Sequence, residues 1–460
     1  MGTSRYSVFP GAAVGYVYAK GCHMKHINIG IIGFGTVGTG VARLLLTRSD
    51  IIARRIGVTL HLKHVADIDL TTDRGLSLPE GVLIDDAQRL VNDPDIHIVV
   101  ETVGGDTFAK DVIQKAIAQG KHVVTANKAL LAKHGNFLFS EARRRGVSIG
   151  YEASVGGCMP IIKTIREVLV GNRINAMMGI LNGTCNYILT KITHERETFE
   201  SALKEAQDNG FAEADPTFDV EGIDTAHKLA ILISIAYGME IKFDDIYVEG
   251  ISKITTLDIE SAEQFGYRIK LLAISKYKGD AVEARVHPTM IPMENLLSSV
   301  NGSLNAIGIQ GDAVGNMALY GHGAGMMPTG SAILSDIADI SRDMTSGARD
   351  RLPALGFQPD HIRKLPVMPI DDISTQYYIR FSAIDKPGVL SSISGILGNN
   401  SISIKSVHQQ GQNQQGAVPI VMMTYKARES HVRKALQEID DLQIIEGDPM
   451  VIRIEENYQS

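Results

Sequence analysis

Residues 29–40 read IGIIGFGTVGTG, and this stretch decides the fold that we expect for the first part of the chain. An apolar run leads into the glycines, and apolar residues at helical spacing follow them. A strand, a glycine turn and a helix in this order are typical of a dinucleotide-binding turn. Gly33 would permit the tight turn, Gly35 would let backbone approach a pyrophosphate, and Gly38 would let the helix pack closely on the strand. An ordinary βα turn is the alternative interpretation.

Strands and helices alternate through the first 150 residues. Apolar runs predict further strands at 61–66, 96–100, 122–125 and 147–151, with an amphipathic helix at 111–119. Strands separated by helices imply an α/β fold with a parallel sheet, in which ligands lie at the carboxyl ends of the strands. Thr102, Lys128 and Glu152 each follow a strand end, so we expect them to line one cleft.

Composition excludes several classes of function. The 460 residues, 44% apolar and 21% charged, fit about two to four globular domains. A net charge of −7 gives no basic surface for nucleic acid, and no apolar run reaches the roughly 20 residues that cross a membrane. Cys22, Cys158 and Cys185 form neither a disulfide framework nor a zinc-binding spacing. We therefore expect a cytoplasmic protein without nucleic-acid or membrane partners.

The first 24 residues have little pattern. Arg5 precedes a mildly apolar run, which would permit a signal peptide, but glycines break that run. Met24 stands directly before the first strand and is a natural start. We expect residues 1–24 to be a disordered extension.

The pattern changes after residue 150. We expect helices at 160–170, 198–209, 222–238 and 332–343, a turn at 182–184, and short strands mixed with helix over 244–300. Prolines and acidic residues near 360–375 indicate a boundary. Beyond it we expect strands at 377–384, 402–408, 417–425 and 450–455, helices after the turn at 385–390 and over 429–438, and a polar loop at 409–416. This βαββαβ order predicts a ferredoxin-like module.

Residues 210–228 are dense in carboxylates and lead into an apolar helix. Asp224 and Lys228 are four residues apart and share one face of that helix, which continues into apolar positions. A surface salt bridge is one interpretation, but partial burial of the pair favours a functional role. Burial would lower the pKa of Lys228, whereas the neighbouring carboxylate would raise it. His227 lies on another face, and we interpret it as structural.

Two other positions leave alternatives open. Asp67 ends the second strand, where an acidic residue accepts hydrogen bonds from ribose and favours NAD. It lies 29 residues after Gly38, a longer spacing than usual, and Arg74 could instead bind the 2′-phosphate of NADP. The loop that begins at Glu152 could bind a hard cation through backbone carbonyls, although a simple βα loop explains it equally well.

Several longer motifs together resemble the homoserine dehydrogenase family, in its long form with a C-terminal ACT domain. They are GFGTVG (33–38), TANKALLA (125–132), YEASVGGCMP (151–160), GILNGTCNYIL (179–189), GFAEADPTFDVEGIDTAHKLAIL (210–232), RVHPTMIP (285–292), NAIGI (305–309), YGHGAGMMPTGSAILSDI (320–337) and DKPGVL (385–390). The long central segment is far more specific than the glycine turn. The resemblance implies reversible NAD(P)H-dependent reduction of L-aspartate 4-semialdehyde to L-homoserine, a step toward threonine, methionine and isoleucine.

The resemblance also implies roles for residues. Lys228 would donate the proton to the carbonyl oxygen, Lys128 would assist, Glu213 would hold the substrate amino group, and Asp219 and Asp224 would line the site. A sodium ion would be held by Glu152 and the backbone carbonyls of Val155, Gly157 and Met159. The implied cofactor contacts are Gly33, Phe34, Gly35, Thr36, Val37, Gly38, Asp67, Thr102, Lys128 and Gly302. Ala66 stands where the family often has a basic residue, which weakens the case for NADP.

The resemblance suggests how the chain is divided and regulated. We expect a Rossmann-like NAD(P)-binding domain at 25–150, completed by part of 305–355, an α+β catalytic and dimerisation domain at 151–304, a return segment at 305–360 and a ferredoxin-like ACT regulatory domain at 372–460. An amino-acid effector, threonine in the family, would bind the ACT domain of a homodimer or homotetramer. The alternatives are another amino-acid dehydrogenase on the same scaffold and a catalytically silent amino-acid sensor.

Overall fold

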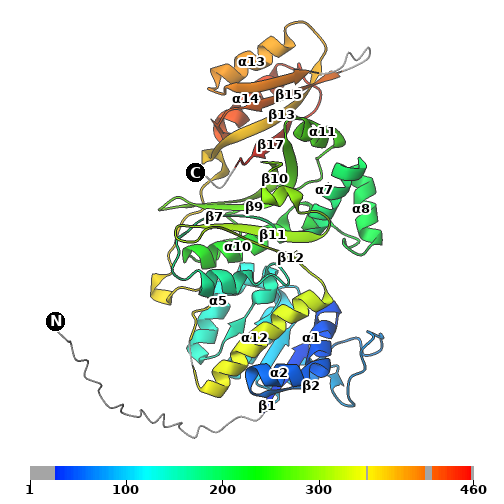
Figure 1. The fold of residues 1–460 in the computed structure, drawn as a ribbon, viewed down its shortest axis with the longest axis vertical. Coiled ribbons are helices and arrows are strands. Elements are labelled where there is room, and N and C mark those ends of the chain that lie inside the picture. Colours follow the sequence, from blue (N-terminus) through cyan, green and yellow to red (C-terminus); the bar gives the residue numbers. More distant parts are fainter. Residues whose placement is uncertain (1–25, 349–350, 410–416, 457–460) are drawn as a thin grey trace, which may run out of the picture.

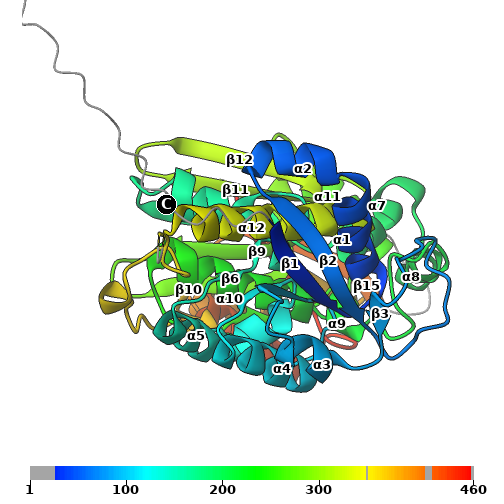
Figure 2. The same cartoon turned by 90° about the horizontal axis from the view of Figure 1, so that it is seen from below.

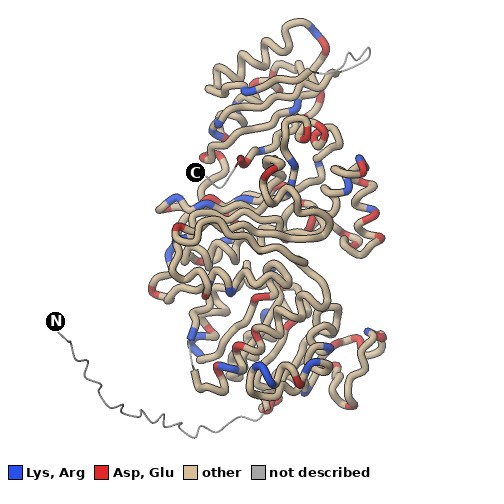
Figure 3. The backbone as a smooth tube through the Cα atoms, viewed as in Figure 1, with Lys and Arg blue, Asp and Glu red and all other residues tan. Residues whose placement is uncertain are grey.

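The computed structural model describes residues 26–348, 351–409 and 417–456. The expected extension at 1–24, Cys22 and nearly all of the polar loop at 409–416 lie outside the described residues. Figure 1 shows three layers of structure along the long axis: a parallel sheet with its helices, a mixed sheet, and a C-terminal module. In Figure 3, the positions of Lys and Arg and those of Asp and Glu are interspersed along the backbone.

The first sheet is parallel, as predicted. Its order is β3-β2-β1-β4-β5-β6, so the strand order reverses direction between β1 and β4. The strands are β1 (His26–Ile32), β2 (Thr59–Ala66), β3 (Leu83–Ile84), β4 (Ile98–Glu101), β5 (His122–Thr125) and β6 (Ile149–Gly150). Such a reversal opens a crevice at the carboxyl ends of the strands.

Helices cover both faces of this sheet (Figure 2). They are α1 (Thr36–Thr47), α2 (Ser49–Ile56) and α12 (Met326–Ser346) on one face, and α3 (Ala87–Asn92), α4 (Thr107–Ala118) and α5 (Lys128–Arg145) on the other. Helix α12 lies directly against α1, because a Cβ added to Gly40 would lie 2.3 Å from the carbonyl oxygen of Met326. It is longer than the helix expected at 332–343, since its first turns contain Pro328, Gly330 and Ser331, which give little sign of a helix in the sequence.

The second sheet is mixed, and one part of it differs from the expectation. Its strands are β7 (Ile174–Ile180), β8 (Tyr247–Val248), β9 (Tyr267–Tyr277), β10 (Val282–Pro292), β11 (Leu304–Gly311) and β12 (Gly315–His322). The expectation of short strands over 244–300 is wrong, because β9 and β10 form a hairpin of two 11-residue strands. Both strands are buried on both faces, which hides the alternating pattern that marks a half-exposed strand.

The helices of this part of the chain are α6 (Ile161–Lys163, continued as a π-helix over Thr164–Val168), α7 (Gly183–Glu195), α8 (Phe199–Asp208), α9 (Thr217–Val220), α10 (Ile223–Tyr237) and α11 (Thr256–Gln264). Helices α7, α10 and α11 contact the strands of the second sheet. The turn expected at 182–184 is wrong. Asn182 is the N-cap of α7, and its side chain accepts a hydrogen bond from the N–H of Cys185. An Asn-Gly pair predicts a turn and an N-cap alike, so only the residues that follow decide between them.

The C-terminal module confirms the predicted βαββαβ order, with one short strand added. It contains β13 (Ser374–Ile384), α13 (Val389–Asn399), β14 (Ile404–Gln409), β15 (Ala417–Thr424), β16 (Ala427–Arg428), α14 (Glu429–Asp441) and β17 (Met450–Ile454). Within the described residues β17 pairs in parallel with β10, so the second sheet continues into the module in the order β12-β11-β7-β9-β10-β17-β13-β15-β14. This continuity has no signature in the sequence.

Buried charges reinforce that junction. Glu455, just after β17, lies 2.8 Å from the ammonium of Lys276 on β9 and also pairs with Arg285 on β10. Across the same junction, Asp258 of α11 accepts hydrogen bonds from Arg380 and Tyr378 of β13, at 2.7 and 3.0 Å.

Within the described residues, none of the helices is both long and apolar enough to span a bilayer.

Candidate functional site

The central feature of the candidate site is the buried carboxylate of Asp224, which contacts two lysines. Asp224 begins α10, and its Oδ2 lies 2.7 Å from Nζ of Lys228 one turn later. Its other oxygen lies 3.2 Å from Nζ of Lys128, the first residue of α5. Because α5 covers the first sheet and α10 covers the second, this cluster lies where the two sheets meet. The structure therefore brings together Lys128, Asp224 and Lys228, which are spread over 100 residues of sequence.

Asn182 joins a second carboxylate to this cluster. Its Nδ2 donates to Asp219 Oδ1 and to Asp224 Oδ2, each at 2.8 Å, while its Oδ1 caps α7. Thr184 also donates to Asp219, at 3.3 Å. Sequence reasoning does not single out Asn182. The available signal is an Asn directly before a helix, but its bridging role depends on the approach of α9 and α10.

The electrostatics follow from burial and from the two lysines. Burial by itself would raise the pKa of Asp224, but the ammonium groups of Lys228 and Lys128 outweigh it and hold that pKa well below its usual range. The attraction of Asp224, together with Asp219 and Glu213, raises the pKa of Lys128. Burial and the neighbouring Asp224 raise the pKa of Asp219. At neutral pH Asp224 is therefore an ionised carboxylate, and it lies between the side chains of Lys128 and Lys228.

Lys228 is positioned so that its ammonium group can exchange a proton with a ligand. Its side chain is only 10% exposed, and besides Asp224 its Nζ donates to the carbonyl oxygen of Leu181 at 2.6 Å. An ammonium group has three N–H bonds, so one remains for a ligand. Glu213 is exposed, and its carboxylate has no hydrogen-bond partner among the described residues. It lies near enough to Lys128 to affect that residue's pKa, so it can offer a negative charge to a cationic group of a ligand.

The glycine turn fits a pyrophosphate. Gly35 is the N-cap of α1 and supplies no side-chain cap, so N–H groups of the first turn are left for a ligand. A Cβ on Gly35 would meet nothing within 4 Å, whereas one on Gly38 would lie 1.9 Å from the carbonyl oxygen of Gly33. The hydroxyl of Thr102 donates to that same oxygen at 2.8 Å. Gly35 therefore faces open space, and Gly38 is required for packing. Phe34, Thr36 and Val37 belong to the same turn, with Phe34 buried beneath it.

Asp67 and Arg74 lie beside this turn. Asp67 Oδ2 accepts the N–H of Phe34 at 2.5 Å, and its Oδ1 accepts the N–H of Asp69 at 2.9 Å. Arg74 donates to Asp69 at 3.1 Å, and its guanidinium lies 5.1 Å from the ring centroid of Phe34. Asp67 is thus fixed next to the turn, and Arg74 forms ion pairs with both carboxylates, at 3.1 Å from Asp69 and 3.8 Å from Asp67.

The loop after β6 holds Glu152 in a closed environment. Both oxygens of its carboxylate accept backbone N–H groups, from Ile162 and Lys163, each at 2.9 Å. Burial and the nearby Asp336 raise the pKa of Glu152 to about 8. Of the three carbonyls expected to bind a cation, that of Met159 accepts the N–H of Ile161. Those of Val155 and Gly157 accept no hydrogen bond from the described residues, so oxygen ligands remain for a hard cation.

Gly302 and Cys185 both form hydrogen bonds with neighbouring groups of the protein. Gly302, between η3 (Leu296–Ser299) and β11, has a positive φ of 63°, and its N–H donates to Thr190 of α7 at 3.1 Å. Cys185 is fully buried, and burial raises the pKa of its thiol well above the ordinary value. That thiol donates to the carbonyl oxygen of Asp219, so Cys185 packs beneath the site.

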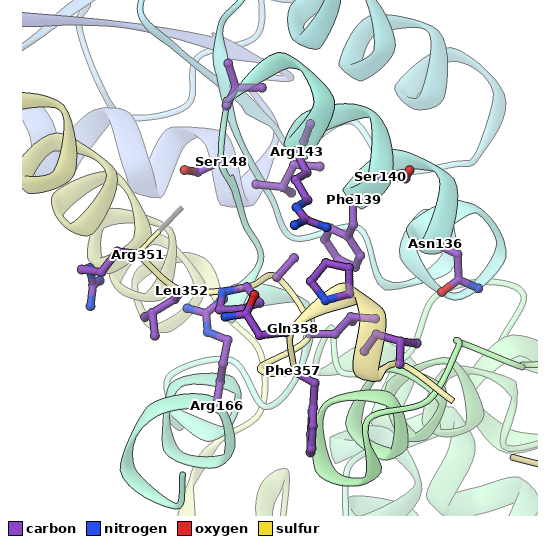
Figure 4. Close-up of a pocket in the computed structure, with 18 of the residues that line it drawn as sticks. Asn136, Phe139, Ser140, Arg143, Ser148, Arg166, Arg351, Leu352, Phe357 and Gln358 are labelled. Carbon is purple, nitrogen blue, oxygen red and sulfur yellow. The ribbon is translucent and has the colours of Figure 1, made fainter. Parts of the chain in front are cut away.

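A separate cavity of about 500 Å³ lies away from the lysines (Figure 4). Phe139 and Arg143 from the second half of α5 line it, together with Arg166, Leu352 and Phe357. Lys128 begins α5, and the helical rise places Phe139 about 16 Å from it. This cavity therefore does not belong to the lysine–carboxylate cluster.

Comparison with known proteins points to one family. Models described as "Homoserine dehydrogenase, NAD binding domain", "Homoserine dehydrogenase" and "ACT domain" match residues 33–152, 160–338 and 377–443. The chain is similar to the homoserine dehydrogenase of Pseudomonas aeruginosa, with 44% identity over 94% of this chain and 100% of that protein. The corresponding protein of Neisseria gonorrhoeae is 42% identical over 94% of this chain and 99% of its own length.

Solved structures agree with these relatives. The crystal structure of a homoserine dehydrogenase from Thiobacillus denitrificans matches with a TM-score of 0.89 and 44% identity, covering 94% of this chain and 99% of that one. A hyperthermophilic archaeal homoserine dehydrogenase in complex with NADPH matches with a TM-score of 0.59 and 28% identity, covering 68% of this chain and 96% of that one.

His227, next to Lys228, is buried without a hydrogen-bond partner in the described part of the chain. Its ring stacks on Phe243 with centroids 4.1 Å apart and lies 5.3 Å from Phe218. Neither ring nitrogen has a partner, and burial lowers the pKa of His227 to about 4. The residue therefore acts as an aromatic packing group, in keeping with the structural role expected from the sequence.

We expect His227→Phe to gain stability relative to the wild type as the pH falls. Between about pH 6.5 and pH 4 the unfolded chain binds a proton that the folded protein excludes, so the histidine destabilises the folded state progressively. At pH 5 this difference amounts to about 2 kcal/mol, and phenylalanine removes it. Urea unfolding at pH 7 and pH 5 measures the change, with His322→Gln, an exposed position, as the control. An equal stability difference at both pH values would show that His227 is not held neutral.

Proposed function

Since the chain belongs to the homoserine dehydrogenase family of NAD(P)-dependent oxidoreductases that act on a CH–OH group, we propose that the Lys128–Asp224–Lys228 cluster is its reaction centre. The observation that carries this proposal is the buried Asp224 carboxylate between two ammonium groups from different layers. The reaction interconverts L-homoserine and L-aspartate 4-semialdehyde. The cytoplasmic location expected from the cysteine content belongs to the same proposal.

Lys228 acts as the proton donor to the carbonyl oxygen during reduction. A bound nicotinamide would supply the hydride, and Lys228 would give a proton to the carbonyl oxygen as that oxygen gains negative charge. Asp224 and the carbonyl of Leu181 hold the ammonium of Lys228 in place through hydrogen bonds. In the reverse direction neutral Lys228 accepts the hydroxyl proton of homoserine.

Charge complementarity supports the placement of the substrate. L-homoserine carries one ammonium and one carboxylate. Glu213, without a partner among the described residues, is suited to the ammonium, and Lys128 supplies positive charge on the other side. Asp219, held by Asn182 and Thr184, completes the polar wall. These assignments make the substrate orientation depend on residues from α5, α9 and the loop before α9.

We expect Lys228→Ala to lower kcat by about 10²–10⁴, the usual loss when a general acid is removed. Binding of the nicotinamide cofactor should stay near the wild-type level, because Lys228 lies on α10 and not in the glycine turn before α1. Homoserine-dependent reduction of the cofactor, followed by absorbance, measures the rate. The control is Lys133→Ala on the exposed side of α5. A wild-type rate in Lys228→Ala would remove this residue from the reaction.

Asp67 makes NAD the preferred cofactor in our proposal. Its carboxylate lies beside the glycine turn, where it would accept ribose hydroxyls and repel a 2′-phosphate. The nearby Arg74 is already bound to Asp69. The archaeal relative of known structure is a complex with NADPH, so the family as a whole does not decide the choice.

We expect Asp67→Ser to shift the preference toward NADP, because it removes the repulsive charge and the 3.8 Å ion pair between Asp67 and Arg74. The ratio of kcat/KM for NADP to that for NAD should rise by about tenfold or more, as expected for about 1.4 kcal/mol of lost repulsion. Asp73→Ser, an exposed acidic residue in the same loop, is the control. An unchanged ratio would show that Asp67 does not select the cofactor.

Sodium is part of the proposal for the loop at 152–159. The carbonyls of Val155 and Gly157 are free of protein donors among the described residues, and the carboxylate oxygens of Glu152 retain lone pairs beyond their two hydrogen bonds. We expect the melting temperature to be several degrees higher in sodium chloride than in choline chloride at equal ionic strength, because a ligand that binds only the folded state stabilises it. Equal melting temperatures would argue against a sodium site.

Threonine is the effector that we propose for the ACT domain. The supporting feature is the turn at 385–390, where Gly388 has a φ of 94° and opens α13. A valine in that conformation is strained, so Gly388→Val should relieve threonine inhibition while keeping most of the uninhibited rate. Gly395→Ala inside α13, where a Cβ meets nothing within 4 Å, is the control. Equal inhibition of Gly388→Val and wild type would place the effector elsewhere.

A homodimer or homotetramer completes the proposal. Strand β12 ends the long sheet, and its residues alternate between exposed and half-buried. Such an unpaired edge is suited to pairing with a second chain. Light scattering after size-exclusion chromatography distinguishes the dimer, the tetramer and the monomer.

A further inference from the structure

The cavity of about 500 Å³ in Figure 4 lies between α5 and the segment 351–362 of the chain. Phe139 of α5 and Leu355 of that segment line it with buried side chains, and the half-buried Ile362 adds to the same apolar wall. Cavities of this size typically hold a small molecule between apolar side chains and a few polar groups. The proposed reaction centre contributes no side chain to the lining, so within the described residues this is a separate cavity.

The walls of the cavity are held in place by contacts that need no ligand. The hydroxyl of the buried Tyr151, directly after β6, donates to the carbonyl oxygen of Ala354. The ring of Tyr151 also lies 5.1 Å from the ring of Phe139. Just after the segment, the N–H of Arg363 donates to the carbonyl of Gly238, at the end of α10, at 2.8 Å. The cavity is therefore formed before a ligand enters, which favours binding.

Arg143 on α5 is an exposed cation without a partner in the described part of the chain. It lines the cavity, and its guanidinium has neither a hydrogen bond nor an ion pair there. In Figure 4 it extends toward the cavity from α5, while Arg166 extends toward it from the opposite side. The next residue, Arg144, differs in both respects, because it pairs with Glu141 and does not line the cavity.

Arg166 supplies a second guanidinium group, and this one is largely buried. Its side chain, in the π-helix after α6, is only 12% exposed. Its Nη2 pairs with Glu167 at 3.2 Å, whereas its Nε is buried without a hydrogen-bond partner among the described residues. A guanidinium group has five N–H bonds, so the protein leaves several of these donors unused. A buried cation in this state is unfavourable, and a nearby anion would stabilise it.

The acidic side chains that line the cavity already have basic partners. Asp343 lies 3.0 Å from Arg351, and Asp339 lies 2.6 Å from Lys163. Glu240 is 40% exposed and lies 3.9 Å from a lysine ammonium. The unmatched charges at the cavity are therefore positive, and they favour an anionic ligand.

We propose that this cavity binds a small carboxylate with an apolar body, such as an aromatic or branched-chain acid. The carboxylate lies between Arg143 and Arg166, because a guanidinium group matches its planar shape with paired N–H donors. The apolar body lies against Phe139 and Leu355. A phosphate is less suited, since a strongly hydrated ion gains nothing from an apolar wall. This site goes beyond the proposed function and does not depend on it.

Calorimetric titration of the full-length protein with 3-phenylpropanoate tests the proposal. We expect a dissociation constant of about 1 mM or lower, an affinity within reach of a molecule of this size. Arg143→Gln should weaken binding by about tenfold or more, as for a lost hydrogen bond to a charged group. It should fold, because Arg143 is exposed, and the melting temperature without ligand checks this. The matched control is Arg144→Gln, which should bind like the wild type.

Two comparison ligands test the chemical class. The alcohol 3-phenylpropan-1-ol has the same apolar body without the charge, and propanoate has the charge without the body. Each should bind at least about tenfold more weakly than 3-phenylpropanoate. Equal binding of the alcohol, or tighter Arg143-dependent binding of inorganic phosphate, would overturn the assignment to an apolar carboxylate.

Three results would overturn the site itself. The first is the absence of binding up to about 10 mM 3-phenylpropanoate, ten times the expected dissociation constant. The second is wild-type affinity in Arg143→Gln. The third is loss of binding in Lys228→Ala, which would place the ligand in the reaction centre, whereas the proposal predicts wild-type affinity in that variant.

Discussion

The buried carboxylate of Asp224 is the interaction on which the rest of the site depends. Its partners, Lys128, Lys228 and Asn182, come from three helices and from both sheets. A buried charge is tolerated only when its partners satisfy it together, since removing one leaves an uncompensated charge in a medium of low polarity. The geometry of the cluster therefore requires α5, α7 and α10 to pack correctly at the same time.

The C-terminal module is joined to this arrangement by a continuous sheet and by charge. Arg453 of β17 pairs with Glu429 of α14 and, at 2.8 Å, with Glu249 after β8. Two residues further on, the N–H of Ile251 donates to the carbonyl of Val220 at the end of α9. Helix α9 also carries Asp219. A short path of ion-paired, covalently linked and hydrogen-bonded residues therefore connects the module that matches the ACT family to Asp219, a carboxylate of the proposed reaction centre.

A sequence pattern predicts features that depend on residues close together in the chain. It does not predict hydrogen bonds and ion pairs between polar groups that are distant in the sequence. The strands of the first sheet, the glycine turn and the βαββαβ order follow local rules of periodicity and turn chemistry, and the structure confirms them. The long hairpin of β9 and β10 resembles a set of short strands in the sequence because burial on both faces removes the alternating pattern. The start of α7 resembles a turn because Asn and Gly favour both. Asn182 carries no such signal, because its partners are distant in the sequence.

The sequence by itself determined the parallel nucleotide-binding sheet, the acidic segment before α10 and the pairing of Asp224 with Lys228, because each depends on residues that are neighbours along the chain. The motifs that indicate the family are likewise contiguous runs of residues. Only the tertiary structure decided that Lys128 reaches the same carboxylate, that Asn182 bridges two acids and that β17 continues the sheet of β10. These contacts join separate elements, and their energies depend on burial, which no local pattern of residues records.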